Sequence, residues 1–217
     1  MFSARRYLLL GFFTVVLVVL VNLAWWEYYG RTEKLLDTQL SRRLSAVAAA
    51  AALSVDPDDV TMSGLGDLDA YSKLIRVLAR VQESDSLSEV FILAADYSYI
   101  ATTLTERDSV YFLSQLNATY IDSALFGLNH QPVTTASYRT GPITLKSAFA
   151  PLVDSTGLVL AVLGVEADVD YFDALSTLRR NLRVASFFSI AGGLVSGLIF
   201  LGIQAKLNRA EQHASMN

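Results

Sequence analysis

The chain has 217 residues, of which 53% are hydrophobic and 18% are charged, and its mean hydropathy is +0.39. Soluble domains carry about 25% charged residues, so part of the apolar surface is expected to face lipid. The net charge is −4 and the chain has no cysteine, which excludes thiol catalysis and thiolate metal sites.

Two long runs carry no charged residue, residues 7–26 and residues 184–205. Twenty helical residues span about 30 Å, which is the thickness of the hydrocarbon core of a bilayer. The first run is too long for the apolar part of a signal peptide, and it ends in aromatic residues typical of a membrane interface. We therefore expect two transmembrane helices, the first one uncleaved.

Basic residues flank the two runs on their outer sides: Arg5 and Arg6 precede the first, and Lys206 and Arg209 follow the second. The positive-inside rule then predicts a two-pass protein of the bacterial inner membrane with both termini cytoplasmic. The predicted parts are residues 1–29 (amino terminus and first crossing), 30–183 (extracytoplasmic domain), 184–205 (second crossing) and 206–217 (start of a cytoplasmic linker helix).

The middle segment carries 13 Lys and Arg against 19 Asp and Glu. Nucleic-acid binding requires a basic face, so no nucleic acid is expected as a partner.

The first part of the middle segment is helical in pattern. Apolar residues at spacings of three and four continue from the first crossing to about Val55, where Asp56-Pro57 ends the helix. Residues 56–67 are rich in Asp and Gly and predict a loop. Residues 68–81 form a second amphipathic helix with one apolar stripe.

Strands follow. Val90–Ala95 and Tyr97–Thr103 predict a hairpin that turns at Asp96 and Ser98. Residues 108–128 are irregular or helical, with Asp108 as a candidate helix cap. Three further strands are expected at residues 133–139, 143–153 and 158–165, and the last of these is apolar on both faces, as a central strand is. A helix capped by Asp168 or Asp170 then continues into the second crossing.

Two stretches carry a family resemblance, Phe91–Asp96 with Tyr99–Thr103, and Ala150–Gly157 with Val162–Glu166. They are similar to the first and last hairpins of a single Cache domain, the extracytoplasmic relative of the PAS fold, although the usual glycine of the first turn is absent. The resemblance covers residues 30–183. It implies an α+β fold, a PAS-like antiparallel sheet of five strands with a long amino-terminal helix.

The tail, residues 206–217, resembles the linker helix that precedes the dimerisation segment of sensor histidine kinases. Its Leu207, Ala210 and Ala214 lie on a heptad-like seam. Ser189, Gly193 and Gly197 form a small-residue stripe in the second crossing. A homodimer is therefore expected, with a kinase module outside these residues and no enzyme within them.

Arg139 is the sharpest candidate ligand residue, because it ends a strand beside Tyr138 and Thr140. A guanidinium with neighbouring hydroxyls suits a carboxylate. The alternative is a solvated surface arginine. Lys146 and Ser147 lie on opposite faces of the next strand, so one of them should point at a pocket, and an exposed Lys146 is the favoured interpretation.

Glu166 stands where the last strand of the family ends in an acid, and in relatives that bind amines that acid pairs with the ammonium. The alternative is an acid favoured at a helix start. Tyr99, with Tyr97, Tyr111 and Tyr120, either lines a pocket or belongs to the core.

The histidines at 130 and 213 are interpreted as structural, and no catalytic residue, metal site or cofactor is predicted. The leading hypothesis is a transmembrane receptor in contact with lipid that senses a small molecule, a carboxylate or an amino acid. The alternative is a ligand-free interaction or dimerisation module that binds a periplasmic protein. A sensor should show an enclosed cavity, and an interaction module a filled core with an exposed apolar patch.

Overall fold

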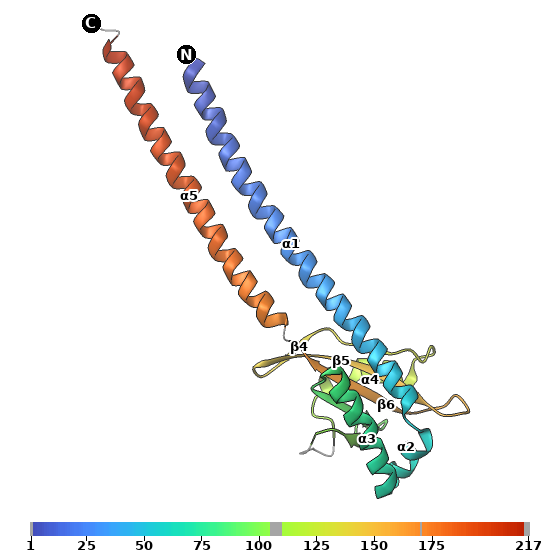
Figure 1. The fold of residues 1–217 in the computed structure, drawn as a ribbon. Coiled ribbons are helices and arrows are strands. Elements are labelled where there is room, and N and C mark those ends of the chain that lie inside the picture. Colours follow the sequence, from blue (N-terminus) through green and yellow to red (C-terminus); the bar gives the residue numbers. More distant parts are fainter. Residues whose placement is uncertain (1, 105–109, 170, 215–217) are drawn as a thin grey trace. The chain divides into compact units, whose positions relative to one another are not determined.

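Figure 1 shows the computed structural model of the chain, which describes residues 2–104, 110–169 and 171–214. It divides into two compact units, residues 35–172 and a helical unit of residues 1–34 with 173–217. The elements are α1 (Phe2–Ser54), α2 (Pro57–Gly64), α3 (Leu68–Asp85), β1 (Glu89–Leu93), β2 (Tyr99–Thr102), α4 (Ser114–Phe126), β3 (Val133–Thr134), β4 (Tyr138–Thr140), β5 (Ile143–Val153), β6 (Val159–Asp168) and α5 (Tyr171–Ala214).

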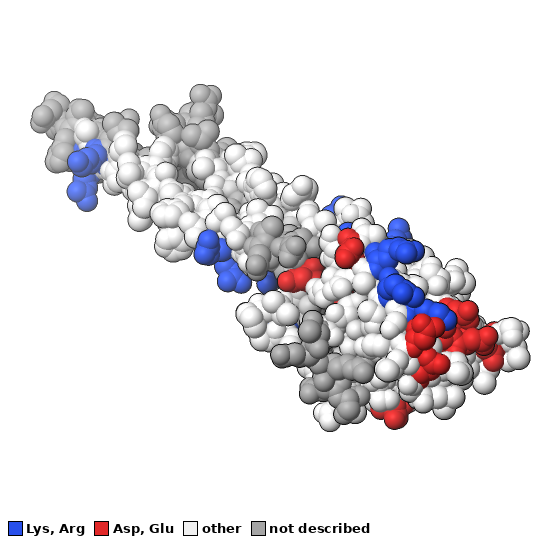
Figure 2. Space-filling view, turned by 60° about the horizontal axis from the view of Figure 1, so that its bottom comes forward, with Lys and Arg blue, Asp and Glu red and all other residues white. Residues whose placement is uncertain are grey.

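Two helical stretches of the described chain are long and apolar enough to cross a membrane. They lie within Gly11–Ser54, with a mean hydropathy of 1.6, and Ser176–Ile203, with a mean hydropathy of 2.1, which agrees with the two predicted crossings. Within the helical unit the Asn22 side-chain amide donates to the Ser189 hydroxyl at 3.3 Å. Figure 2 shows mostly uncharged side chains along the long helices, whereas acidic and basic side chains lie side by side over the domain.

The amino-terminal helix ends as predicted, but the residues after it are not all loop. The helix α2 occupies Pro57–Gly64, and the Asp56 carboxylate caps it by accepting the backbone N–H of Asp58 at 3.0 Å. Proline suits the first turn of a helix because its missing N–H has no partner there. The Asp-Pro pair was therefore a start signal as well as a stop signal.

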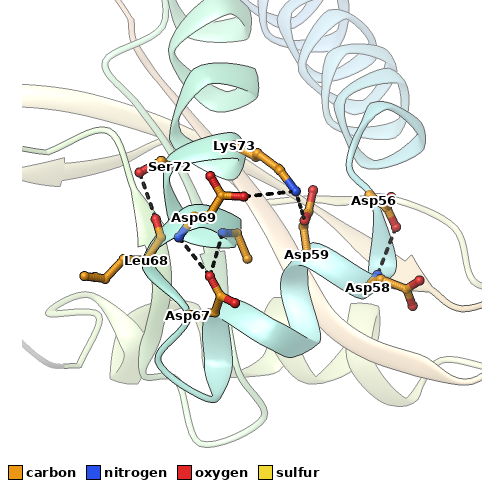
Figure 3. Close-up of polar contacts among 9 residues, drawn as sticks. Asp56, Asp58, Asp59, Asp67, Leu68, Asp69, Ser72 and Lys73 are labelled. Carbon is orange, nitrogen blue, oxygen red and sulfur yellow. Dashed lines mark hydrogen bonds and ion pairs between the residues drawn. The ribbon is translucent and has the colours of Figure 1, made fainter.

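The acidic residues of this region cap the helices α2 and α3 and form ion pairs with Lys73, as Figure 3 shows. The Asp67 carboxylate accepts the backbone N–H groups of Asp69 at 2.8 Å and of Ala70 at 3.1 Å. The Lys73 ammonium lies 3.3 Å from Asp59 and 3.4 Å from Asp69. Asp67 is thus a helix cap, which satisfies backbone donors that the helix itself leaves free.

The sheet is antiparallel, in the order β2-β1-β6-β5-β3, and β4 also pairs with β5. The predicted central position of the last strand is confirmed, since β6 lies between β1 and β5. The single strand expected at residues 133–139 is wrong: β3 and β4 pair with successive parts of β5, and residues 135–137 interrupt them. Within the described residues the sheet therefore has six strands where the resemblance implied five.

Each face of the sheet has its own core. On one face, α1 and α3 pack on the strands, and this first core includes Leu44, Ala48, Leu74, Leu78, Val90, Ile92, Leu163 and Val165. On the other face, α4 and the residues before it form the second core, which includes Phe91, Leu93, Tyr111, Leu113, Ile121, Phe149 and Val162. The predicted α+β class, with an antiparallel sheet and a long amino-terminal helix, is confirmed.

Close packing on the second face requires a glycine in the middle of β6. Gly164 lies opposite Phe91 of β1 and Phe149 of β5. A Cβ atom at Gly164 would overlap the Phe91 ring. A glycine in a strand interior often marks such a close approach.

The turn between β1 and β2 lies at Asp96 and Ser98 as predicted. The Asp96 carboxylate accepts the backbone N–H of Ser98 at 3.1 Å, and Tyr97 takes the left-handed conformation, with φ of 65°. Glycine favours that conformation, and its absence here is the departure from the family pattern. The Tyr97 hydroxyl donates to Asp122 of α4 at 2.7 Å, which holds the turn against that helix.

The remaining helices differ in detail from the predictions. Residues 110–128, as far as they are described, contain one helix, α4, and Asp108 lies outside the described residues. The cap predicted at Asp168 is wrong, because this residue is the last of β6, and Asp170 lies outside the described residues. From Tyr171 to Ala214 the chain is one continuous helix.

Candidate functional site

Glu166 of β6 is the centre of a buried polar cluster. Three hydroxyl groups lie within hydrogen-bond distance of its Oε1 atom: those of Tyr111, of Tyr138 at 3.0 Å and of Ser147 at 3.0 Å. The Tyr138 and Ser147 hydroxyls lie 2.5 Å apart, and either one can donate to the other. Because a hydroxyl carries one proton, the one that donates to its neighbour leaves the other to donate to Glu166. The Asn117 side chain completes the Glu166 cluster by donating to Tyr111 Oη at 3.0 Å and to Tyr138 Oη at 3.3 Å.

The cluster joins the sheet to residues 111–126, which pack over its second face and are named the cover. Ser147 and Glu166 are directly opposite one another on β5 and β6, and Tyr138 comes from β4 at the edge of β5. Asn117 belongs to α4, and Tyr111 lies shortly before that helix. A second link is the backbone N–H of Tyr111, which donates to the carbonyl of Tyr97 at 3.0 Å. The cover is thus held to the sheet by hydrogen bonds rather than by apolar packing alone.

Burial sets the protonation of these groups. Glu166 is only 2% exposed, and Ser147, Tyr111 and Asn117 are buried with it. Burial raises the pKa of the Glu166 carboxyl, while the three hydroxyl donors oppose the rise. Burial and the charge of Glu166 also raise the pKa of Tyr138 to about 12 and that of Tyr111 above its usual value, so both tyrosines remain donors at neutral pH.

A second buried carboxyl lies beside the cluster. Glu89 of β1 is 3% exposed, and it is directly opposite Glu166 in the β1–β6 ladder. The Thr102 hydroxyl donates to Glu89 Oε1 at 2.7 Å. Burial first, and the charge of Glu166 to a smaller extent, raise the pKa of Glu89 from its usual 4.5 to about 7.

Three of the predicted ligand residues come together here: Tyr138, Ser147 and Glu166. A fourth, Tyr99, belongs to the same second core, and its ring centre lies 5.8 Å from that of Phe91. Glu166 was predicted from the family resemblance, and the structure places it at the meeting point of the sheet and its cover.

The structure separates the other three predicted residues from the cluster. Arg139 is exposed, and its Nε donates to the carbonyl of Gly141 at 3.2 Å. Thr140 is half-buried at the end of β4, paired with Ile143. The alternation that places Tyr138 in the cluster turns Arg139 away from it, because successive strand side chains point to opposite faces.

Lys146 lies on the face opposite Ser147, as predicted, but the expectation that it is exposed is wrong. Its side chain is 1% exposed, and its ammonium donates to Asp37 of α1 at 2.6 Å. The long helix covers this face of β5, so a charged residue there is buried and paired.

Sequence reasoning missed Glu89 and Asn117, and it named Tyr111 only as a pocket or core aromatic residue. Glu89 had a usable signal, since it shares the period of two with Phe91 and Leu93, which are core residues of the same face. Tyr111 and Asn117 come from a stretch without clear periodicity, and only the folded chain brings them to Glu166.

Three hollows of the described domain lie away from the Glu166 cluster. The first, of about 410 Å³, is lined by residues of α1 and β5 that include Ala52 and Pro151. The second, of about 350 Å³, is lined by residues of α2, α3 and β2 that include Tyr71 and Ser98. The third, of about 330 Å³, lies between the end of α4 and the β5–β6 hairpin and includes Leu128 and Leu158. Glu166 does not line any of these hollows, and the polar atoms around it form hydrogen bonds with one another.

No family model matches the chain. No curated protein matches it either. Among solved structures, the chain is similar to the sensor domain of DcuS from E. coli, with 15% identity and a TM-score of 0.46, over 66% of this chain and 98% of that one.

Two chemoreceptor domains are also similar. The ligand-binding domain of the amino-acid chemoreceptor PctC from Pseudomonas aeruginosa, solved with GABA, has 15% identity and a TM-score of 0.44, over 70% of this chain and 64% of that one. That of Tlp3 from Campylobacter jejuni, solved with 4-methylisoleucine, has 10% identity and a TM-score of 0.43, over 73% and 58%. The chain thus spans less than two thirds of both chemoreceptor domains. One of these neighbours is a sensor domain and two are ligand-binding domains, and at 10–15% identity the likeness concerns the fold alone.

Proposed function

We propose that the chain is the sensing part of a transmembrane receptor, and that the domain of residues 35–172 binds a small polar molecule outside the cell. The observation that carries the proposal is the Glu166 cluster. A buried carboxyl ringed by hydroxyls costs folding free energy that an apolar core would not. Buried groups with displaced pKa values gather at functional sites, and this cluster lies where the sheet meets its cover.

The chemistry of the cluster selects a ligand that donates hydrogen bonds. The described partners of Glu166 are hydroxyl groups. An ammonium group would replace the Tyr111 hydroxyl as a donor to Glu166 and would form a stronger, charge-assisted hydrogen bond. An amine or the amino group of an amino acid meets this requirement. A carboxylate at Arg139 remains a separate proposal, at the exposed end of β4.

Binding would be transmitted through β6. A ligand that parts Tyr111 from Glu166 changes the contacts of β6. The strand ends at Asp168, and the continuous helix α5 begins at Tyr171. The ligand shifts the receptor only by its difference in affinity for the two arrangements. The proposed setting is a homodimer in the bacterial inner membrane, with both termini cytoplasmic and a histidine kinase output module outside these residues.

A ligand-free interaction module is the second candidate. The sheet face around Glu166 is filled, and apolar side chains are exposed, among them Leu53 at 90% and Leu128 at 96%. Such side chains suit contact with a protein partner.

Thermal unfolding of the full chain in lipid nanodiscs, with amines, amino acids and carboxylates added in turn, tests the sensor proposal. A ligand at 100 times its dissociation constant should stabilise the domain by about 2.7 kcal/mol. We expect an amine or amino acid to act, Glu166→Gln to abolish the effect, and Glu83→Gln, which changes an exposed carboxyl of α3, to leave it intact.

Other outcomes have definite meanings. A carboxylate whose effect is lost in Arg139→Ala but kept in Glu166→Gln would move the site to the end of β4. A well-folded chain that no compound stabilises would favour the interaction module.

A further inference from the structure

Glu89 and Glu166 face one another across the middle of the sheet. They are register partners in the antiparallel β1–β6 ladder, and both side chains point toward the second core. Directly opposite residues of this kind have Cβ atoms about 5 Å apart. The two residues are 3% and 2% exposed. We name them the carboxyl pair.

The groups that face the carboxyl pair bring hydroxyls and an amide rather than positive charge. They come from every neighbouring element of the described chain: Tyr99 and Thr102 from β2, Tyr111 and Asn117 from the cover, Tyr138 from β4 and Ser147 from β5. Asp168, two residues beyond Glu166 on the same face, is exposed. Lys146 is turned to the other face, where it pairs with Asp37.

More hydroxyl groups lie within hydrogen-bond distance of Glu166 than of Glu89. Three hydroxyl groups lie within hydrogen-bond distance of Glu166 Oε1, whereas Glu89 has the Thr102 hydroxyl at 2.7 Å and the Tyr99 side chain. Hydrogen bonds to a carboxylate favour its charged form, so Glu166 is the better place for a negative charge. Two negative charges so close in a buried site repel one another, and nearby carboxyls in that position retain a proton.

We propose that the carboxyl pair is a proton-binding site, and that through it the domain senses acidity as a signal in its own right. At acidic pH the pair holds a proton, and β1, β6 and the cover remain closed over it. At higher pH both members are charged, and their repulsion weakens the β1–β6 ladder and the contact of Tyr111 with Glu166.

The direction of the pH dependence follows from proton linkage. The pKa of Glu89 is 4.5 in an unfolded chain and about 7 in the folded domain. Between these values the folded state binds more protons than the unfolded one, so stability falls as pH rises through this window. A pKa raised from 4.5 to about 7 corresponds to a change on the order of 300-fold in the folding equilibrium constant.

The decisive experiment is urea unfolding of the full chain in nanodiscs, without added ligand, from pH 4.5 to 8. We expect the unfolding midpoint to fall as pH rises, and Glu89→Gln to flatten most of this dependence because glutamine does not titrate. Glu83→Gln, at an exposed carboxyl, should leave the profile unchanged. A profile equally steep in the wild type, Glu89→Gln and Glu166→Gln would overturn the proposal.

Infrared difference spectroscopy provides a readout that does not depend on unfolding. The folded wild-type chain should lose a protonated-carboxyl band between pH 5 and 8, and that band should be missing or displaced in Glu89→Gln. Absence of the band from the wild type at pH 5 would also contradict the proposal. Neither measurement uses a small molecule, so the proposal of a proton-binding site and the proposal of a ligand-binding site can be contradicted independently of one another.

Discussion

The ammonium of Lys146 on β5 donates to the Asp37 carboxylate on α1 at 2.6 Å, and the hydroxyl of Ser137 donates to the same carboxylate oxygen at 3.0 Å. The next residue of β5, Ser147, donates to Glu166 on the other face of the sheet. Consecutive residues of one strand therefore contact the long amino-terminal helix and the buried cluster. A shift of β5 in response to the cluster would reach α1 through this ion pair.

The two single substitutions that break this ion pair should lower the free energy of unfolding by different amounts. Lys146 is 1% exposed and the Asp37 side chain is 42% exposed. Asp37→Ala leaves a buried ammonium without its partner, and we expect a loss of about 3 kcal/mol in the free energy of unfolding. Lys146→Met leaves a carboxylate that water can reach, and it should cost less. Urea unfolding of both variants and of the double variant measures the coupling.

A surface pair provides the matched control for that cycle. Arg43 and Asp85 lie 3.4 Å apart with side chains 58% and 31% exposed. Arg43→Ala should change the stability by about 1 kcal/mol or less, as exposed ion pairs do. Equal losses from Asp37→Ala and Arg43→Ala would show that the buried pair has no special weight.

Gly164→Ala should destabilise the domain, because the added methyl group overlaps the Phe91 ring in a closely packed core. Overpacking of this kind costs about 1–3 kcal/mol. Gly64→Ala in α2 is the control, since a Cβ atom there meets no other atom within 4 Å. Thermal unfolding should rank the two variants clearly, and a stable Gly164→Ala would mean that β1 and β6 can separate at little cost.

Tyr111→Phe removes one hydroxyl donor from Glu166 and leaves the ring in place. The loss should cost about 1–3 kcal/mol, because a buried acceptor loses a partner. Since that hydrogen bond lowers the pKa of Glu166, its removal should raise this pKa further. Stability should then fall with rising pH over a wider range than in the wild type.

The same measurement distinguishes this effect from a general loss of packing. Tyr120→Phe alters a half-buried tyrosine that packs against the same core. The urea unfolding midpoints of both variants should be measured from pH 4.5 to 8. We expect the pH dependence of the midpoint to change in Tyr111→Phe and to remain that of the wild type in Tyr120→Phe. A parallel displacement of both profiles would argue against a link between Tyr111 and the titration of Glu166.

Asp67→Ala should weaken the start of α3. Its carboxylate accepts two backbone N–H groups there, and loss of such a cap costs about 1 kcal/mol. Asp69→Ala, two residues on, removes an 81% exposed carboxylate whose contact is with Lys73 at 3.4 Å. Thermal unfolding should show the larger loss for Asp67→Ala, and the reverse order would assign the stability to the ion pair instead.

Much of the fold was predictable because periodicity records it locally. The first part of β6, up to Leu163, is apolar on both faces, and the central position of the strand could be predicted from that pattern alone. The helix that ends near Val55 followed from its apolar spacing and from Asp56-Pro57. The break between β3 and β4 was missed, because both short segments pair with β5 and the interruption at residues 135–137 has no strong turn signal.

Within the candidate site, strand alternation determined that Lys146 and Ser147 lie on opposite faces, and the family resemblance pointed to Glu166. The sequence by itself also determined two helices apolar enough for a membrane and an α+β domain between them, since these depend on composition and period. Only the tertiary structure decided that Glu89 faces Glu166, that Tyr111 and Asn117 complete the cluster, and that Asp37 partners Lys146. Such contacts join residues far apart in the chain, and the burial that changes their pKa values exists only after the sheet, α1 and α4 have packed together.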